Sequence, residues 1–254
     1  MRHSLGWDRA RLLIEDRTSL PTSDIERFDA LVELRARHVP LQHLTGVQEF
    51  YGRTYRVSPA VLIPRPETEL LVEAMLRHFL GIRSPIVVDV GTGSGCIGLS
   101  VAAERPDSRV FATDVSPEAL AIARDNARHL GLDARVSFHE GDLLGAVPES
   151  VGPLDAILCN PPYVDTRDEA LLMPEVRDHE PRLALFPPGD AFSIYRRLAP
   201  SAHDRLASGG YLAVEVGVDQ ARAVASIIEA SSFDILEILA DLQGRPRVVV
   251  ARRA

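Results

Sequence analysis

The tetrapeptide Asn160-Pro161-Pro162-Tyr163 combines residue types that can hold a planar –NH2 group. The two prolines stiffen the chain and lack N–H groups, so the carbonyl oxygens of Asn160 and Pro161 are free to accept hydrogen bonds. The side-chain oxygen of Asn160 is a further acceptor. Acceptors that converge on an amino group favour positive charge on its nitrogen, and Tyr163 can stack on its plane. The motif therefore predicts chemistry at an amide or aromatic amine nitrogen, with Asn160, Pro161, Pro162 and Tyr163 as the catalytic residues.

A glycine-rich segment, residues 91–95, follows the short apolar run Ile86–Val90. Glycine lets the backbone turn sharply and approach a ligand closely. A ligand held there lies beyond the carboxyl end of the strand, at the N-terminus of the next helix. Asp114 ends the next predicted strand and can bind both ribose hydroxyls of a nucleoside. Together these features predict a nucleoside cofactor.

The glycine spacing separates two kinds of nucleoside site. The dinucleotide fingerprint requires G-x-G-x-x-G, and Cys96 stands where that fingerprint has its third glycine. The segment resembles instead the binding loop of S-adenosylmethionine-dependent methyltransferases, in which an acid such as Asp89 ends the strand before the turn. By the same resemblance Asp142 accepts from the adenine amino group and Leu143 packs on the adenine face, although Gly141-Asp142 is equally typical of a simple turn. The cofactor contacts that this implies are Asp89, Gly91, Thr92, Gly93, Ser94, Gly95, Asp114, Asp142, Leu143 and Asn160.

In this setting Asn160–Tyr163 resemble the signature of methyltransferases that act on planar nitrogens, either adenine in nucleic acid or the side-chain amide of glutamine. Other segments resemble the peptide chain release factor glutamine methyltransferases, from about Leu12 to the C-terminus. These segments are Pro40–Gly46, Glu49–Gly52, Leu62–Glu69, His179–Pro181, Ala184-Leu185, Glu215–Gly217 with Gln220, and Asp241–Arg247.

The resemblance implies methyl transfer from S-adenosylmethionine to the glutamine of the Gly-Gly-Gln tripeptide in bacterial class I release factors. It implies that Asn160–Tyr163 hold the glutamine and that Arg65, Pro66, Glu67 and Thr68 line the site from a linker. It also implies that a helical N-terminal domain, about two helices shorter here than is usual in the family, helps to dock the release factor. For Glu180 two roles stay open, an acceptor near the site or an ion pair with an arginine.

The elements that must position these residues follow from apolar periodicity. Residues 1–39 are expected to be helical, with a capping box at Ser23–Glu26 and a stripe of core residues at Ile25, Phe28, Leu31, Val32 and Leu34. Residues 47–63 indicate a β-hairpin, and Pro66 favours a helix start. After Gly81, strands and helices alternate.

We therefore expect an α/β fold, a Rossmann-like class I S-adenosylmethionine-dependent methyltransferase sheet of seven strands, with a small helical N-terminal domain and a β-hairpin linker. The expected divisions are a helical docking domain (1–46), a hairpin and linker helix (47–80) and a catalytic domain (81–254).

Composition narrows the alternatives. The chain has no lysine, which excludes Schiff-base and P-loop chemistry. Residues 81–254 carry 17 Arg against 25 Asp and Glu, so no basic face for nucleic acid is visible. The histidines show no metal-ligand spacing, the two cysteines cannot form a disulfide framework, and no apolar run reaches the length of a membrane span.

We expect a cytoplasmic monomer that binds neither metal, membrane nor, stably, nucleic acid. Three rival functions remain: an adenine-amino methyltransferase, a non-catalytic binding module and a nicotinamide oxidoreductase. The intact residues Gly91, Gly93, Gly95, Asp114 and Asn160 argue against the binding module.

Overall fold

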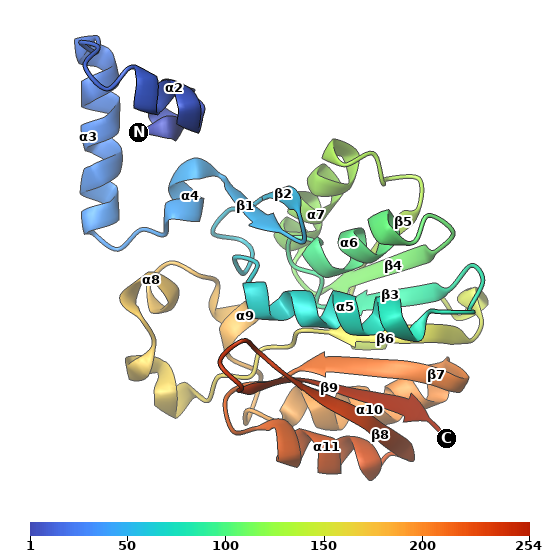
Figure 1. Cartoon of the computed structure of the whole chain (residues 1–254). Helices are drawn as coiled ribbons and strands as arrows, with labels where there is room; N and C mark the ends of the chain where they lie inside the picture. The colour runs from blue at the N-terminus through green and yellow to red at the C-terminus, as the bar shows by residue number, and fades with distance from the viewer.

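A seven-stranded sheet with the strand order β5-β4-β3-β6-β7-β9-β8 forms the centre of the molecule (Figure 1). The computed structural model describes all residues, 1–254. Strands β3 to β7 pair in parallel, whereas β9 is antiparallel to both β7 and β8. The strands are β3 (Ile86–Val90), β4 (Arg109–Asp114), β5 (Val136–Glu140), β6 (Leu154–Cys159), β7 (Leu206–Glu215), β8 (Phe233–Ala240) and β9 (Pro246–Arg253). The predicted sheet and its closing antiparallel pair are confirmed.

Helices cover both faces of this sheet, because its strands are apolar on both sides. Successive strand residues such as Val87 and Val88 belong to two different buried clusters. One cluster includes α5 (Glu69–His78), α6 (Cys96–Glu104) and the end of α7 (Pro117–His129), and the other includes α10 (Ser193–Arg205) and α11 (Ala221–Glu229). The strand order reverses between β3 and β6, and in such sheets the carboxyl ends at that reversal hold the ligand.

Capping and proline residues mark the starts of two of the helices that flank this edge. The side chain of Ser116 accepts a hydrogen bond from the Ala119 N–H at 3.1 Å, and Pro117 occupies the first turn of α7, as predicted. Pro66 opens the short 3-10 helix η1 (Pro66–Thr68), which leads directly into α5. The remaining short helices are η2 (Leu143–Ala146), η3 (Glu149–Val151), η4 (Thr166–Leu171), α8 (Pro174–Arg177) and α9 (Arg182–Leu185).

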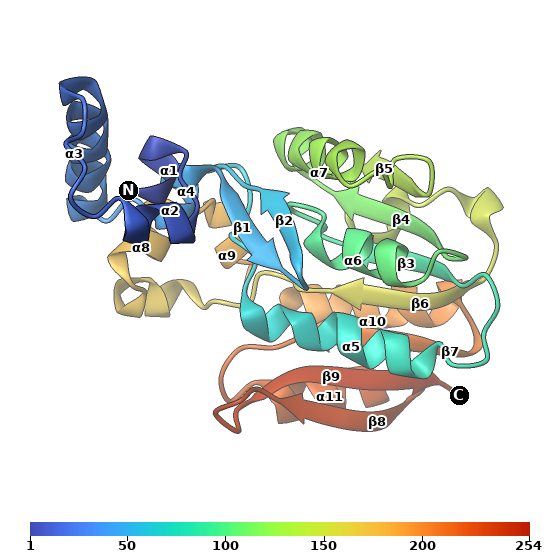
Figure 2. The ribbon, with the colours of Figure 1, turned by 45° about the horizontal axis from the view of Figure 1, so that its top comes forward.

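The N-terminal helices stand apart from the sheet and are joined to it through a two-stranded hairpin (Figure 2). These elements are α1 (Arg2–Leu5), α2 (Arg9–Ile14), α3 (Thr22–Ala36), α4 (Leu41–Thr45), β1 (Val47–Phe50) and β2 (Arg53–Arg56). The hairpin ends at Arg56, so the predicted strand character of residues 57–63 is wrong. These residues instead run toward the carboxyl edge of the sheet.

Two expectations for α3 are also wrong. The helix begins at Thr22 after Pro21 and has no side-chain cap, so Ser23 lies inside its first turn and the capping box does not form. The apolar stripe is not a core stripe, because α3 buries no residue and Ile25, Val32 and Leu34 are each more than 40% exposed. The reason is geometric: α3 lies beyond the sheet, and α1 and α2 are too short to cover it. No helix of the chain is both long enough and apolar enough to cross a membrane.

Candidate active site

A cavity of about 450 Å³ opens at the carboxyl ends of the central strands. It brings together most of the residues that the sequence singled out. Those that line it are Arg65, Thr68, Gly91, Thr92, Gly93, Ser94, Asp114, Asp142, Leu143, Asn160, Pro161 and Pro162. Five predicted site residues do not line it: Pro66, Glu67, Asp89, Gly95 and Tyr163.

The glycine-rich loop forms one wall of the cavity. The Gly93 N–H donates to Asp114 Oδ2 at 2.9 Å, and the Ser116 N–H donates to Asp114 Oδ1 at 2.9 Å. Burial raises the pKa of Asp114, and these N–H donors lower it. Asp114 therefore fixes the loop while it faces the cavity.

Asp89 lies behind the same loop and is fully buried. Its Oδ2 accepts hydrogen bonds from Thr92 Oγ1 at 2.6 Å and from the Gly98 N–H at 2.9 Å. Burial raises its pKa to about 6, and the two hydrogen bonds oppose that rise. In this structure Asp89 joins the loop to the start of α6 and does not reach the cavity wall.

Asn126 of α7 joins the loop to the linker hairpin. Its side chain is buried; Oδ1 accepts from the Arg56 N–H at 2.7 Å, and Nδ2 donates to the carbonyls of Arg56 at 3.0 Å and Ser94 at 2.8 Å. One side chain thus bonds both to β2 and to the glycine-rich loop.

The cavity wall is mostly apolar, but two of its residues carry unpaired hydroxyls. The buried hydroxyls of Ser94 and Thr113 both belong to lining residues and have no hydrogen-bond partner in the chain. Such groups are costly unless a ligand or water satisfies them. Asp142 pairs with Arg197 of α10, which also lines the cavity.

The segment after β6 presents its acceptors as the sequence predicts. The carbonyl oxygens of Asn160 and Pro161 and the side-chain oxygen of Asn160 accept no hydrogen bond from the chain. The Asn160 side chain is held through its nitrogen, which donates to Thr68 Oγ1 at 3.2 Å. The oxygen of that amide is left for a ligand.

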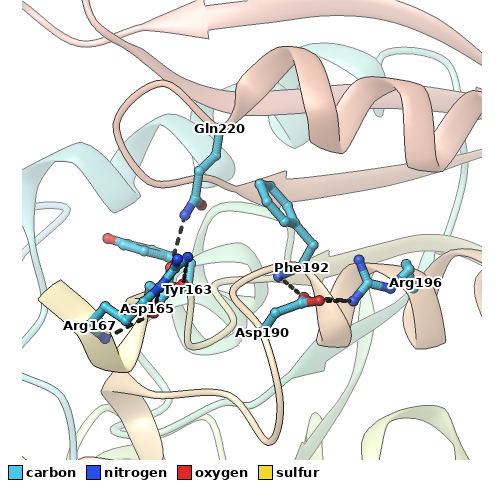
Figure 3. A network of polar contacts seen from close by, with 7 residues as sticks. All are labelled: Tyr163, Asp165, Arg167, Asp190, Phe192, Arg196 and Gln220. Carbon is cyan, nitrogen blue, oxygen red and sulfur yellow. Dashed lines mark hydrogen bonds and ion pairs between the residues drawn. The ribbon is translucent and has the colours of Figure 1, made fainter.

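Tyr163 is held from two sides. Its hydroxyl donates to Glu215 Oε1 at 3.2 Å, and its carbonyl accepts from Gln220 Nε2 at 2.9 Å (Figure 3). Its ring lies against Gly217, where an added Cβ would come within 3.0 Å of Tyr163 Cδ2. Tyr163 thus anchors the segment, and its stacking on a substrate stays a prediction.

The linker contributes Arg65, whose Nη2 pairs with Glu180 Oε1. Glu180 Oε2 also accepts from the Ile63 N–H at 3.4 Å, and burial raises the pKa of this carboxyl while Arg65 lowers it. Of the two roles left open for Glu180, the structure shows the ion pair.

Sequence reasoning missed part of the wall. Ala60, Val61, Leu62 and Pro64 line the cavity because the hairpin ends early, and an alternating pattern gave no signal of this. Other residues come from α9, α10 and the segments beside them, which pack over the site only in three dimensions. They are Pro181, Leu183, Ala184, Pro188, Ile194 and Arg197.

Comparisons with known proteins agree with this geometry. A methyltransferase small domain model matches residues 66–177, and a PrmC N-terminal domain model matches residues 1–46. Among solved structures, a methyltransferase from Pyrococcus furiosus has a TM-score of 0.60 at 16% identity, covering 89% of this chain and 98% of that one. The T. thermophilus 16S rRNA N2 G1207 methyltransferase, solved with AdoMet and guanosine, has a TM-score of 0.59 at 18% identity, covering 82% of this chain and 50% of that one. These structural likenesses show a methyltransferase fold.

Curated relatives extend the likeness over nearly the whole chain. The chain is 43% identical over 252 residues to the release factor glutamine methyltransferase of Cereibacter sphaeroides, covering 99% of this chain and 88% of the relative. It is 44% identical over 254 residues to that of Moorella thermoacetica, covering 98% and 89%. Together with the methyltransferase fold, these relatives show that the chain belongs to the release factor glutamine methyltransferases, a family of protein-glutamine N5-methyltransferases.

Proposed function

We propose that this protein transfers a methyl group from S-adenosylmethionine to the side-chain amide nitrogen of the glutamine in the Gly-Gly-Gln motif of class I release factors. One observation carries the proposal. Three free acceptors, Asn160 Oδ1 and the carbonyls of Asn160 and Pro161, share a cavity with the glycine-rich loop and Asp114. A nitrogen acceptor and a nucleoside methyl donor can therefore be held in one place.

The residues that would hold S-adenosylmethionine fit its chemistry. Asp114 offers carboxylate oxygens to ribose hydroxyls, and the unpaired hydroxyls of Ser94 and Thr113 lie buried directly behind the cavity wall. Asp142 and Leu143 lie on the same wall for the adenine. When bound, S-adenosylmethionine supplies an electrophilic methyl group.

The chain's own residues act on the glutamine. A carboxamide –NH2 group has two N–H donors, and the Asn160–Pro161 segment offers acceptors for both. As the nitrogen bonds to the incoming methyl group it loses amide resonance and gains positive charge, which fixed carbonyl dipoles stabilise. Holding the nitrogen in line supplies much of the remaining acceleration. The product nitrogen releases its extra proton to water, so no catalytic base is required.

Charge and surface features favour a protein substrate. Residues 81–254 carry an excess of eight acidic groups, which opposes a nucleic-acid backbone. We assign residues 1–46 to release-factor docking, residues 47–80 to the linker and residues 81–254 to catalysis. The exposed Ile25, Val32 and Leu34 of α3 support the docking role. We further propose that the enzyme acts as a monomer in the cytoplasm.

A methyl-transfer assay tests this function. Purified class I release factors, RNA and DNA are offered in parallel with S-adenosylmethionine, and tandem mass spectrometry locates the added methyl. Methyl on the Gly-Gly-Gln glutamine is the expected result, and methyl on adenine alone would refute the substrate. Asn160→Ala is expected to lower kcat about 100-fold or more, as loss of a transition-state hydrogen-bonding group does. We expect this variant still to bind S-adenosylmethionine when binding is measured by calorimetry. If the variant kept its turnover rate, Asn160 would have no role in the mechanism.

A further inference from the structure

We propose that Glu215 is a positioning residue for glutamine methylation: through the hydroxyl of Thr68 it fixes the side-chain amide of Asn160 with Oδ1 toward the substrate nitrogen. The inference deepens the proposed function and rests on it. It also gives a role to the Glu215-Val216-Gly217 and Gln220 motif, which the reaction described above leaves without one.

The sheet brings these groups together. Asn160 follows β6 and Glu215 ends β7, and the two strands are parallel neighbours that pair Cys159 with Val214. Asn160 Nδ2 donates to Thr68 Oγ1 at 3.2 Å, and Thr68 Oγ1 donates to Glu215 Oε2 at 2.6 Å. Thr68 and Glu215 are each only 2% exposed, so water does not compete for the hydroxyl.

The direction of this chain of hydrogen bonds follows from Glu215. An ionised carboxylate only accepts hydrogen bonds, so the single hydroxyl proton of Thr68 points to Glu215. Toward Asn160 the hydroxyl oxygen can then only accept. The amide must therefore present Nδ2 to Thr68, which leaves Oδ1 as the group that a substrate meets.

Without the carboxylate this order is lost. A Thr68 hydroxyl released from Glu215 can donate to Asn160 Oδ1, and the amide can then turn by half a rotation. In that orientation Asn160 presents –NH2 to the –NH2 of the substrate, donor against donor. Ground-state docking of a whole release factor changes little, but the stabilisation of the methylated nitrogen is lost.

The second oxygen of Glu215 holds the other end of the motif. Oε1 accepts from the Tyr163 hydroxyl at 3.2 Å, while Gln220 Nε2 donates to the Tyr163 carbonyl at 2.9 Å. Figure 3 shows Gln220 reaching Tyr163 from the segment that follows β7. A side chain at Gly217 would come within 3.0 Å of the Tyr163 ring. The same short segment thus anchors both Asn160 and Tyr163.

Ionisation of Glu215 connects this arrangement to pH. Glu215 interacts electrostatically or by hydrogen bonding with six other titratable or charged groups: Glu67, Cys96, Cys159, Tyr163, Tyr195 and Arg247. Burial raises the pKa of Glu215 to about 7, whereas the hydrogen bonds from Thr68 and Tyr163 and the charge of Arg247 lower it. Because the ionised form sets the hydroxyl direction, kcat is expected to rise with pH through neutrality.

Thr68→Val, Thr68→Ser and Glu215→Gln test the proposal with a release factor as substrate. We expect Thr68→Val to lower kcat about tenfold or more, the effect of one misdirected buried hydrogen bond, and Glu215→Gln to lower it less, because one of its two amide orientations still accepts from Thr68. KM for the release factor and calorimetric binding of S-adenosylmethionine are expected to stay within about twofold. Thr68→Ser keeps the hydroxyl and should recover most of kcat. The rise of kcat with pH should be absent from Glu215→Gln.

Tyr55→Phe is the matched control, since it removes a buried hydroxyl that bonds to Ser100 at 2.8 Å away from the cavity lining. Equal losses of kcat in Tyr55→Phe and Thr68→Val would overturn the proposal, because they would show general destabilisation. Unchanged kcat in Thr68→Val, or no recovery in Thr68→Ser, would also overturn it. If Thr68→Val does not fold, the pH profile of kcat in Glu215→Gln tests the proposal, and a rise with pH like that of the wild type would overturn it. A wild-type enzyme that does not methylate release factors would refute the proposed function instead.

Discussion

Replacing Gly95 by alanine perturbs the glycine-rich loop at a position where the backbone and the space around it both require glycine. Gly95 has a φ of +84° and caps α6. An added Cβ would meet Leu99 Cδ1 at 2.8 Å and Ala123 Cβ at 3.3 Å. The methyl group therefore has to displace the buried Leu99 side chain and press on Ala123 of α7, or shift the loop.

Gly244→Ala gives the matched control. Gly244 has nearly the same backbone conformation, with a φ of +78°, but an added Cβ there meets nothing within 4 Å. The control is expected to lose about 1 kcal/mol of unfolding free energy from left-handed strain. Gly95→Ala is expected to lose the same amount of unfolding free energy through strain, and about 1–3 kcal/mol more through overpacking.

Urea denaturation followed by circular dichroism measures both losses, and calorimetry measures binding of S-adenosylmethionine. We expect weakened cofactor binding only in Gly95→Ala, because only that loop lines the cavity. Equal stability losses in the two variants would show that the contacts with Leu99 and Ala123 do not affect stability. Unchanged binding of S-adenosylmethionine in Gly95→Ala would show that Gly95 does not shape the cofactor site.

Two further predictions concern buried carboxyls. Native Glu215 binds a proton more tightly than its unfolded form, with a pKa of about 7 against the ordinary 4.5, so ionisation costs the native state stability as pH rises through that interval. Relative to wild type, the unfolding free energy of Glu215→Gln should therefore increase from pH 4.5 to pH 7 in urea titrations, and a constant difference would contradict the raised pKa. Arg65→Met should destabilise at pH 7 by about 3 kcal/mol and more than Glu180→Gln, because it leaves a buried carboxylate alone whereas the arginine is 33% exposed. The opposite order in the same titrations would show that Glu180 is neutral in the fold.

The fold of residues 81–254 could be predicted from the sequence because the patterns that determine it are local. The alternation of short apolar runs with helices set the sheet, and Ser116-Pro117 marked the start of α7 with a cap that the structure contains. The glycine-rich loop and Asn160–Pro162 each follow a strand end, so a parallel sheet alone brings them to one edge.

The errors arise where a local pattern needed knowledge of distant partners. The stripe on α3 has a helical period, but its burial depends on how much of it another element covers, and α1 and α4 contact the helix without burying any of its residues. The alternation of residues 57–63 is that of a strand, yet the paired hairpin ends at Arg56. The roles of Thr68, Tyr163 and Glu215 depend on contacts between residues that are far apart in the sequence. Asn160 and Thr68 are 92 residues apart, and Thr68 and Glu215 are 147 apart, so no rule based on short spacing predicts these contacts.

The three hydrogen bonds of Asn126 restrict which sequences this fold tolerates. The side chain accepts once and donates twice within a buried space, so it needs a neutral carboxamide of asparagine length. Aspartate has no donor for the Arg56 and Ser94 carbonyls, and glutamine is one methylene too long for a packed site. A single substitution at this position therefore loses contacts to the hairpin at Arg56 and to the glycine-rich loop at Ser94 together, so two distant segments constrain the identity of one residue.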